Sequence, residues 1–174
     1  DKEGKKAFWH STSHVMAQVL EEMFPGIQLT LGPAIANGFY YDVDFGDQKI
    51  TEADFKAIES RILEISKEKH EFKMRAVTKA EALETYKDNV YKTELISNLE
   101  DGTITFCDHA TFTDLCRGGH IPNTSIIKAV KIMSVAGAYW RGDEKNKQLT
   151  RVYGTSFPKQ KDLTEYLELL EEAK

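Results

Sequence analysis

The chain has 174 residues, of which 41% are hydrophobic and 29% are charged. This composition is enough for one domain, or two intimate subdomains, with a hydrophobic core. No stretch approaches the roughly 20 apolar residues that cross a bilayer, and residues 1–6 are polar, which excludes a signal-peptide core there. We therefore expect a cytoplasmic protein without membrane contacts. The two cysteines, Cys107 and Cys116, are too few for a disulfide scaffold and are expected to be thiols.

The charge is unevenly distributed along the chain. The net charge of −5 argues against a general nucleic-acid binder. Residues 126–161, however, contain eight lysines and arginines but only two acidic residues. A solvated hairpin and a surface that contacts RNA phosphates both fit this segment.

The first hundred residues are predicted to form helices and a hairpin. Apolar residues recur at helical spacing over residues 11–24, up to a Pro-Gly stop. Two strands are predicted over residues 27–31 and 39–45, because these runs are apolar and glycine-containing turns separate them. Further helices are predicted over residues 51–71, after Thr78, and over residues 91–99, the first two with capping residues at their starts.

The remainder is predicted to be mainly strands. β-Branched and aromatic residues between glycines predict strands over residues 103–107, 126–135 and 149–157. Residues 162–174 return to helical spacing without a Gly or Asn stop, so we expect the natural chain to continue. Helices and strands alternate without a regular βαβ repeat. The predicted class is therefore α+β, with mixed or antiparallel sheets flanked by helices.

Two pairs of residues are candidates for chemistry. His10 and His14 form H-x-x-x-H on the first helix, near its predicted start, so both imidazoles project from one face. Cys116 and His120 form C-x-x-x-H around two glycines, which allow a tight turn. Together they predict either a tetrahedral zinc site or a hydrolytic cluster without metal. The H-E-x-x-H motif of metalloproteases is excluded, because Ser11 stands where that motif has glutamate.

Three further residues of the same types fall outside this pattern. We interpret His70 as a surface residue near a helix end and Cys107 as a packed strand residue. The neighbours of His109 give it no role.

Six motifs, read in order, resemble the second N-terminal domain of threonyl-tRNA synthetases, an editing domain with relatives in alanyl-tRNA synthetases and in free-standing editing proteins. The resemblance runs from about Trp9 to the last predicted helix. The motifs are His10-Ser-Thr-Ser-His14, Leu31-Gly-Pro-Ala-Ile, Asn37-Gly-Phe-Tyr-Tyr-Asp42, Asp114-Leu-Cys-Arg-Gly-Gly-His120, Ala136-Gly-Ala-Tyr-Trp-Arg-Gly-Asp143 and Arg151-Val-Tyr-Gly-Thr155.

The resemblance implies a function and a domain organisation. It implies two intimate subdomains that form an editing cleft, over residues 1–158, and the start of a linker helix to a catalytic core, over residues 159–174. The implied reaction is hydrolysis of serine from tRNA(Thr) by water attack on the ester at the 3'-terminal adenosine. The implied partners are seryl-tRNA(Thr) and the catalytic core of the parent synthetase in cis.

The resemblance also implies roles for individual residues. His10, His14, Cys116, His120 and Lys92 match the catalytic site. Substrate-binding positions are matched by Asp114, which would hold the amino group of serine, and by Gly32 and Tyr41, which would line the pocket. No metal is expected to be required, although zinc at His10, His14, Cys116 and His120 stays possible. One residue departs from the family, because Gly119 replaces a common proline and should loosen the turn before His120.

Other functions stay open from sequence. A trans-acting editing protein would use the same residues. A zinc-stabilised RNA-binding module would use the cluster for structure alone. A cysteine hydrolase of small esters would use Cys116 as nucleophile. The residue that acts as general base is not identified by the sequence.

Overall fold

The computed structural model describes residues 1–174 and confirms the α+β class. Its helices are α1 (Lys2–Met23), α2 (Phe55–Lys67), α3 (Lys79–Thr85), α4 (Val90–Ser97) and α5 (Gln160–Glu172), with short 3-10 turns at Glu52–Asp54, Thr124–Ile126 and Trp140–Gly142. Its strands are β1 (Gln28–Leu29), β2 (Ala34–Ile35), β3 (Gly38–Asp44), β4 (Lys73–Ala76), β5 (Thr105–His109), β6 (Phe112–Leu115), β7 (Ala129–Tyr139) and β8 (Gln148–Phe157). All strand pairs are antiparallel.

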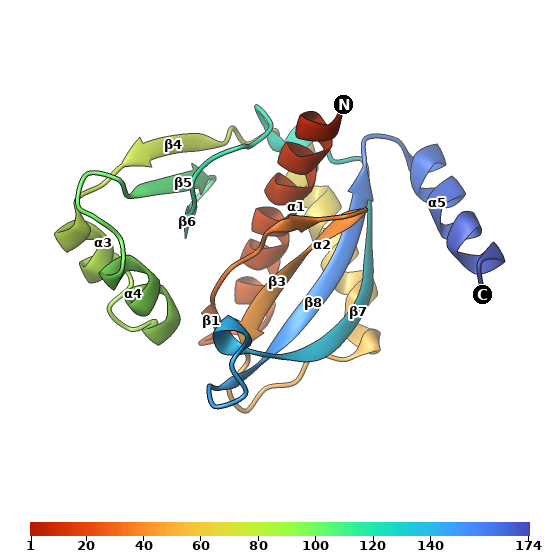
Figure 1. The fold of residues 1–174 in the computed structure, drawn as a ribbon. Helices are drawn as coiled ribbons and strands as arrows, with labels where there is room; N and C mark the ends of the chain where they lie inside the picture. Colours follow the sequence, from red (N-terminus) through yellow and green to blue (C-terminus); the bar gives the residue numbers. More distant parts are fainter.

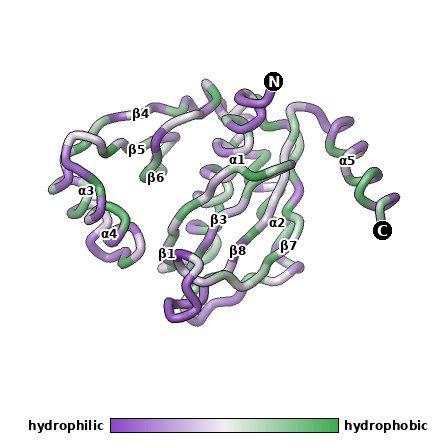
Figure 2. The backbone as a smooth tube through the Cα atoms, in the orientation of Figure 1, coloured by the Kyte–Doolittle hydropathy of each residue, from purple (hydrophilic) through white to green (hydrophobic).

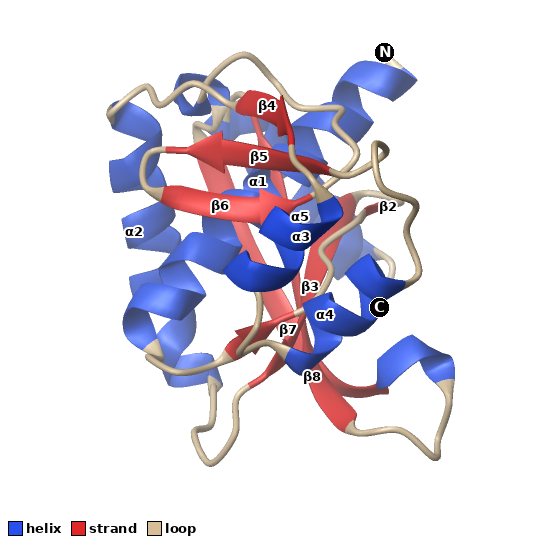
Figure 3. Ribbon diagram, turned by 90° about the vertical axis from the view of Figure 1, so that its left-hand side faces the viewer, coloured by secondary structure: helices blue, strands red, loops and turns tan.

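The elements form two regions (Figure 1). The large region is a sheet of order β1-β3-β8-β7, with β2 also on β3, and α1 and α2 pack against it. The small region is a sheet of order β4-β5-β6 together with α3 and α4. Figure 3 shows the three strands of the small sheet side by side in front of α1. Helix α5 packs beside β7 and β8, at the far end of the molecule from the small region.

Helix α1 begins nine residues before its predicted start. The Asp1 side chain caps it by accepting a hydrogen bond from the Gly4 backbone N–H at 2.7 Å. Residues 2–7 are mostly charged and exposed, so they lack the apolar period on which the prediction depended. The expectation that H-x-x-x-H lies near the start of the helix is therefore wrong, since His10 and His14 lie in its middle.

The hairpin and the capped helices are confirmed. Asn37 has a left-handed φ of 62° in the turn between β2 and β3. Thr51 and Asp54 form the reciprocal hydrogen bonds of a capping box, and a 3-10 turn then leads into α2. Thr78 caps α3 by accepting from the Glu81 N–H. The helix predicted over residues 91–99 is α4.

The predicted strands correspond to elements of the structure, but three strands were missed. Strand β2 has only two residues, which are too few to show a pattern. Strand β4 has four exposed residues and therefore no alternation of apolar and polar side chains. Strand β6 lies within the cysteine motif and was not separated from it. Strand β7 continues four residues past its predicted end, through three small residues and the exposed Tyr139.

The two regions differ greatly in their hydrophobic cores. The large region contains a cluster of 25 buried apolar residues, to which α1, α2 and the main sheet contribute. The core of the small region has only five, Val77, Ala82, Ile96, Ile104 and Phe106. Figure 2 shows that the segments at the start of α1 and in the loop between β7 and β8, by contrast, are hydrophilic.

The basic segment of residues 126–161 forms the β7–β8 hairpin and the start of α5. Half of its eight cations lie near carboxylates, in the pairs Lys131–Glu59, Arg141–Glu94, Arg151–Asp42 and Lys161–Glu165. The segment is therefore less free to bind phosphates than its composition indicates. In addition, none of the helices is long and apolar enough to cross a membrane.

Candidate active site

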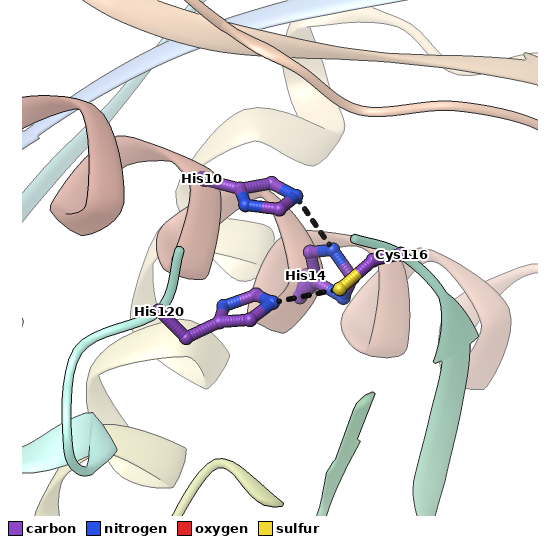
Figure 4. Close-up of side chains that lie close together, drawn as sticks. All are labelled: His10, His14, Cys116 and His120. Carbon is purple, nitrogen blue, oxygen red and sulfur yellow. Dashed lines mark hydrogen bonds between the residues drawn. The ribbon is translucent and has the colours of Figure 1, made fainter. Parts of the chain in front are cut away.

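The two predicted pairs of residues converge on one point (Figure 4). Helix α1 supplies His10 and His14, and the segment after β6 supplies Cys116 and His120. Their ligand atoms all lie within 4.8 Å of one another. The Nε2 atoms of His10 and His14 are 3.1 Å apart, and Cys116 Sγ is 3.2 Å from His120 Nε2. The site therefore lies where the large and small regions meet.

Burial keeps two of the imidazoles neutral. The His14 side chain is 2% exposed, and this burial, reinforced by the nearby imidazoles of His120 and His10, lowers its pKa well below 6.5. Burial also lowers the pKa of His10, with a further contribution from His120. Both side chains are therefore able to accept a proton near pH 7.

The pKa of Cys116 is also lowered, but for a thiol a lowered pKa favours the charged form. A hydrogen bond from the Cys107 thiol, with further help from His120, lowers the pKa of Cys116 to about 5. Cys107 itself is fully buried on β5, as predicted, and this hydrogen bond raises its pKa. The direction of this shift favours the thiolate form of Cys116.

A buried ion pair lies directly beside the cluster. Lys92 of α4 donates a hydrogen bond to Asp114 Oδ1 on β6, and both side chains are only 2% exposed. Tyr41 donates to Asp114 Oδ2 at 2.8 Å, and the Leu115 backbone N–H donates to Oδ1 at 2.8 Å. Lys92 also donates to the Thr30 carbonyl at 3.2 Å. The Asp114 carboxylate is thus fully surrounded by donors, as a buried charge requires.

His14 connects the cluster to the ion pair. Its Nδ1 is buried without a hydrogen-bond partner and lies 3.4 Å from Asp114 Oδ2, which is its nearest charged neighbour. The contact lacks the alignment of a hydrogen bond.

The predicted pocket residues lie against each other. A Cβ atom on Gly32 would be 2.1 Å from the ring of Tyr41, so only glycine permits the ring to lie there. Burial raises the pKa of Tyr41 well above 10, and its hydroxyl remains a donor to Asp114. Gly32 and Tyr41 therefore support the ion pair rather than the histidine cluster.

Helix α4 places Lys92 by fastening to the large region at its first turn. Asn89 caps the helix by accepting from the Lys92 N–H at 3.0 Å, and its amide donates to the Leu29 carbonyl at 2.8 Å. Tyr91 donates to Asp44 Oδ2 at 2.6 Å. No local sequence pattern predicts these contacts, since they join segments about 50 to 60 residues apart.

Two further histidines lie outside the cluster, and two residues that were not predicted contact it. His70 is half-buried after α2 and pairs with Glu68, close to its predicted surface position. His109, to which the sequence assigned no role, is 1% exposed and bonds Gln18 Oε1 at 2.8 Å. Two neighbours of the cluster, Ser11 and Phe72, were not selected from sequence although both contact His120.

The four cluster residues fit a zinc ion by their chemistry. Three imidazoles and one thiolate form a zinc-type donor set, and donor atoms in a tetrahedral zinc site are about 3.5 Å apart. The ligand atoms here are separated by no more than 4.8 Å. The site is therefore able to hold a metal after small side-chain shifts.

A comparison with protein families identifies the region that carries most of this site. Residues 104–153 match a sequence model of the threonyl and alanyl tRNA synthetase second additional domain. Over this range the chain is similar to that domain. The matched range includes Asp114, Cys116 and His120, and the other site residues precede it in the sequence.

Curated relatives match the chain over its whole length. It is 90% identical over 174 residues to the threonine–tRNA ligase of Flavobacterium psychrophilum. It is 62% identical over 176 residues to that of Parabacteroides distasonis, and 55% identical over 176 residues to that of Cytophaga hutchinsonii. In each case the chain spans 27% of the relative's length.

Proposed function

We propose that this second additional domain hydrolyses serine from mischarged tRNA(Thr), within a threonyl-tRNA synthetase. The observation that carries the proposal is the contact between a cluster of neutral imidazoles and a buried carboxylate, 3.4 Å apart at His14 and Asp114. The first part suits water activation, and the second suits recognition of a substrate ammonium group.

The need for such a site follows from the likeness of the two amino acids. Serine lacks one methyl group of threonine, and a lost methyl contact discriminates by only about 10- to 200-fold. A second site that admits serine but has no room for the extra methyl removes the error. The bond to be cut is the aminoacyl ester to the ribose of the 3'-terminal adenosine.

Recognition of the amino group involves an exchange of cations. Asp114 is already paired with the ammonium of Lys92, and neither group is exposed. The substrate ammonium takes the place of Lys92 on Asp114, so that the carboxylate is never left without a cation. The displaced Lys92 ammonium is then free to approach the ester carbonyl, where it stabilises the negative charge that develops on oxygen.

Hydrolysis then requires an activated water. The water loses its proton to a neutral imidazole, attacks the ester carbon, and the ribose oxygen leaves with a proton returned to it. The lowered pKa of His10 and of His14 keeps each ring neutral near pH 7, so each has a ring nitrogen that is free to receive the proton of the water. Cys116 and His120 complete the polar wall. A zinc ion held by all four of His10, His14, Cys116 and His120 would only stabilise the structure, whereas one held by three of them would lower the pKa of a water in the fourth position.

The domain boundaries are part of the same proposal. We assign residues 1–158 to the editing domain and residues 159–174, which contain α5, to the start of a linker helix. The relatives are threonine–tRNA ligases, of which the chain covers 27%. The parent catalytic core in cis and tRNA(Thr) are therefore the proposed partners, in the cytoplasm, where charged tRNA is used.

The test is deacylation of seryl- and threonyl-tRNA(Thr) by the fragment and by the full-length synthetase. We expect selective loss of the seryl ester, reduced at least tenfold by His14→Ala and by Lys92→Met. N-acetyl-seryl-tRNA(Thr), which has no ammonium group, should be a poor substrate. Arg61→Met, in an exposed ion pair away from the site, is the matched control and should not change the rate. Equal hydrolysis of both esters by the full-length protein would reject the proposal.

A cysteine hydrolase is the second candidate, because the pKa of Cys116 is lowered to about 5. In that mechanism the thiolate attacks the ester and forms an acyl-enzyme. Cys116→Ala would then abolish turnover, and alkylation would block the site. Under direct water attack, Cys116→Ala lowers the rate without abolishing it, and no acyl-enzyme accumulates in rapid-quench experiments.

A zinc-stabilised RNA-binding module makes a different prediction. Chelation would lower its melting temperature, and neither ester would be hydrolysed. The same chelation experiment on the full-length protein, read by melting temperature and by deacylation, separates this alternative from the hydrolase.

A further inference from the structure

His120 follows a turn that does not fix its direction. Gly118 and Gly119 both have positive φ, 109° and 80°, and no side chain at either position limits the backbone. The position of the His120 ring, 3.2 Å from Cys116 Sγ, must therefore be set by its neighbours.

Ser11 of α1 holds one edge of the ring. Its Oγ lies 2.9 Å from His120 Nδ1 and accepts a hydrogen bond from the Ile121 backbone N–H at 3.0 Å. Ser11 is fully buried, so no water competes for these contacts. One hydroxyl thus ties both the ring and the next peptide to α1, and this directs Nε2 toward Cys116.

Phe72 holds one face of the ring. The two rings stack with centroids 5.0 Å apart and planes 5° apart, and the opposite face stacks on His10 at 4.4 Å and 19°. The Phe72 N–H donates to the Pro122 carbonyl at 3.1 Å. Phe72 is therefore fastened to the segment that carries His120, and the imidazole is enclosed on both faces.

The stack is supported from behind by the same helix. The His109 ring lies 5.0 Å from that of Phe72 and bonds Gln18 of α1. Ser11 and Gln18 are seven residues apart, two turns along one face of α1. Helix α1 therefore supports the His120 ring directly through Ser11 and indirectly through His109 and Phe72.

We propose that Ser11 and Phe72 are positioning residues for His120, which replace the rigidity that the Gly118-Gly119 turn lacks. The hydroxyl fixes the rotation of the imidazole, and the aromatic ring fixes its plane. The expected effect on catalysis depends on the proposed editing function, whereas the expected geometry of the His120 ring does not.

The first test removes each contact and compares it with a matched change. Ser11→Ala removes the hydroxyl at His120, whereas Thr12→Val removes an equally buried hydroxyl on α1 that bonds Phe8 and Ser156 instead. We expect Ser11→Ala to lower kcat for seryl-tRNA(Thr) about three- to tenfold, with KM within twofold. Thr12→Val should leave both unchanged, although it lowers stability to a similar extent.

Conservative variants separate positioning from a general packing role. Ser11→Thr keeps the hydroxyl and should recover most of the lost kcat. Phe72→Leu keeps an apolar side chain but loses the flat ring, and should lower kcat, whereas Phe72→Tyr keeps the ring and should not. If Ser11→Ala and Phe72→Leu both fold and retain the wild-type kcat, positioning by these residues is rejected.

A second readout does not require activity. Nitrogen-15 spectra of the histidine rings report the hydrogen bonding of each ring nitrogen. We expect Ser11→Ala to shift the Nδ1 signal of His120, and Phe72→Leu to broaden its ring signals, while Thr12→Val changes neither. Unchanged His120 signals would overturn the inference even if editing is confirmed. Shifted signals in a protein without deacylase activity would keep the geometry and reject the proposed function.

Discussion

The large and small regions contribute equally to the candidate site but differ in how firmly they are built. The large region supplies His10, His14 and Tyr41 from around a core of 25 buried apolar residues. The small region supplies Lys92, Asp114 and the segment of residues 116–120, and its own core has five residues. Five buried side chains are few for a stable unit, because burial of each contributes only about 1.5–3 kcal/mol before the entropy cost.

The difference implies that the small region is held in place by contacts to the large one. Some of these contacts are apolar, since Phe112 of β6 belongs to the large core and Tyr91 of α4 packs with Trp140 and Leu149. The others are polar. Lys92 and Asp114 meet Tyr41, Ser11 meets His120, and the first turn of α4 meets β1 and β3. The same contacts arrange the candidate catalytic groups. Docking of the small region and assembly of the site are therefore one event.

The largest expected effect comes from breaking the buried ion pair. Lys92→Met removes the cation and leaves the Asp114 carboxylate buried, which costs about 3–5 kcal/mol of unfolding free energy. Arg61→Met breaks the exposed pair with Glu22, which joins α1 to α2 within the large region, and should cost about 0–1 kcal/mol. Urea denaturation of both variants measures the difference.

Equal losses in the two variants would contradict this comparison. A further variant sharpens it, because Asp114→Asn together with Lys92→Met removes both charges. That double variant should recover part of the lost stability while remaining without activity. Recovery of activity as well would mean that the pair has only a structural role.

Helices and strands were predicted where buried apolar residues recur at a regular spacing, and they were missed where no such spacing exists. Phe55, Ile58, Ile62 and Ile65 recur on one face of α2 and all are buried, so the helix was found. Strand β4 is exposed throughout and owes its place to pairing with β5, which is a tertiary contact. The first turns of α1 depend on a single cap, Asp1, without an apolar face.

The residues that form the site were easier to predict from the sequence than the contacts that these residues make. Sequence spacing predicted the pairs His10–His14 and Cys116–His120, and in the structure the two pairs lie next to each other. Lys92, Gly32 and Tyr41 came from family resemblance alone. The pairing of Lys92 with Asp114 depends on how α4 docks, and the contact of Ser11 with His120 spans 109 residues, so local pattern held no sign of either.

The second largest effect is expected from acid, which should weaken the contact between the two regions. His109 of β5 is buried against Gln18 of α1, and burial lowers its pKa from 6.5 to about 4. Because the unfolded chain binds this proton first, the free energy of unfolding falls as the pH drops from 6.5 to 4, and levels off below. His109 alone accounts for a loss on the order of 3 kcal/mol at pH 4. His10 and His14, whose pKa values are also lowered, act in the same direction.

Two measurements check this pH dependence. Proton NMR should follow the His109 ring to a midpoint near pH 4, provided that the fold persists. Urea denaturation at several pH values should give a shallower dependence for His109→Gln, which cannot titrate but keeps a polar group near Gln18. An unchanged slope in that variant would show that His109 does not drive the loss.

The smallest expected effect concerns Glu94, in the middle of α4, and it tests docking most directly. Trp140 of the β7–β8 hairpin donates its indole N–H to Glu94 at 2.6 Å, and Arg141 donates to the same carboxylate at 3.2 Å. Arg141 has a left-handed φ of 58°, a conformation uncommon outside glycine. Glu94→Gln keeps an acceptor for the indole but loses the charge, and should cost about 0.2–1 kcal/mol.

That global cost is too small to distinguish Glu94→Gln from Glu22→Gln, the matched change in the pair with Arg61. Native-state hydrogen exchange distinguishes them, because it reports opening element by element. If α4 is held by the large region, Glu94→Gln speeds exchange in α3, α4 and the small sheet, whereas Glu22→Gln does not. The same loosening should lower deacylation through Lys92, which lies two residues before Glu94 on that helix. Identical exchange in the two variants would mean that the first turn of α4, at Asn89 and Tyr91, is enough to dock the helix without the hairpin.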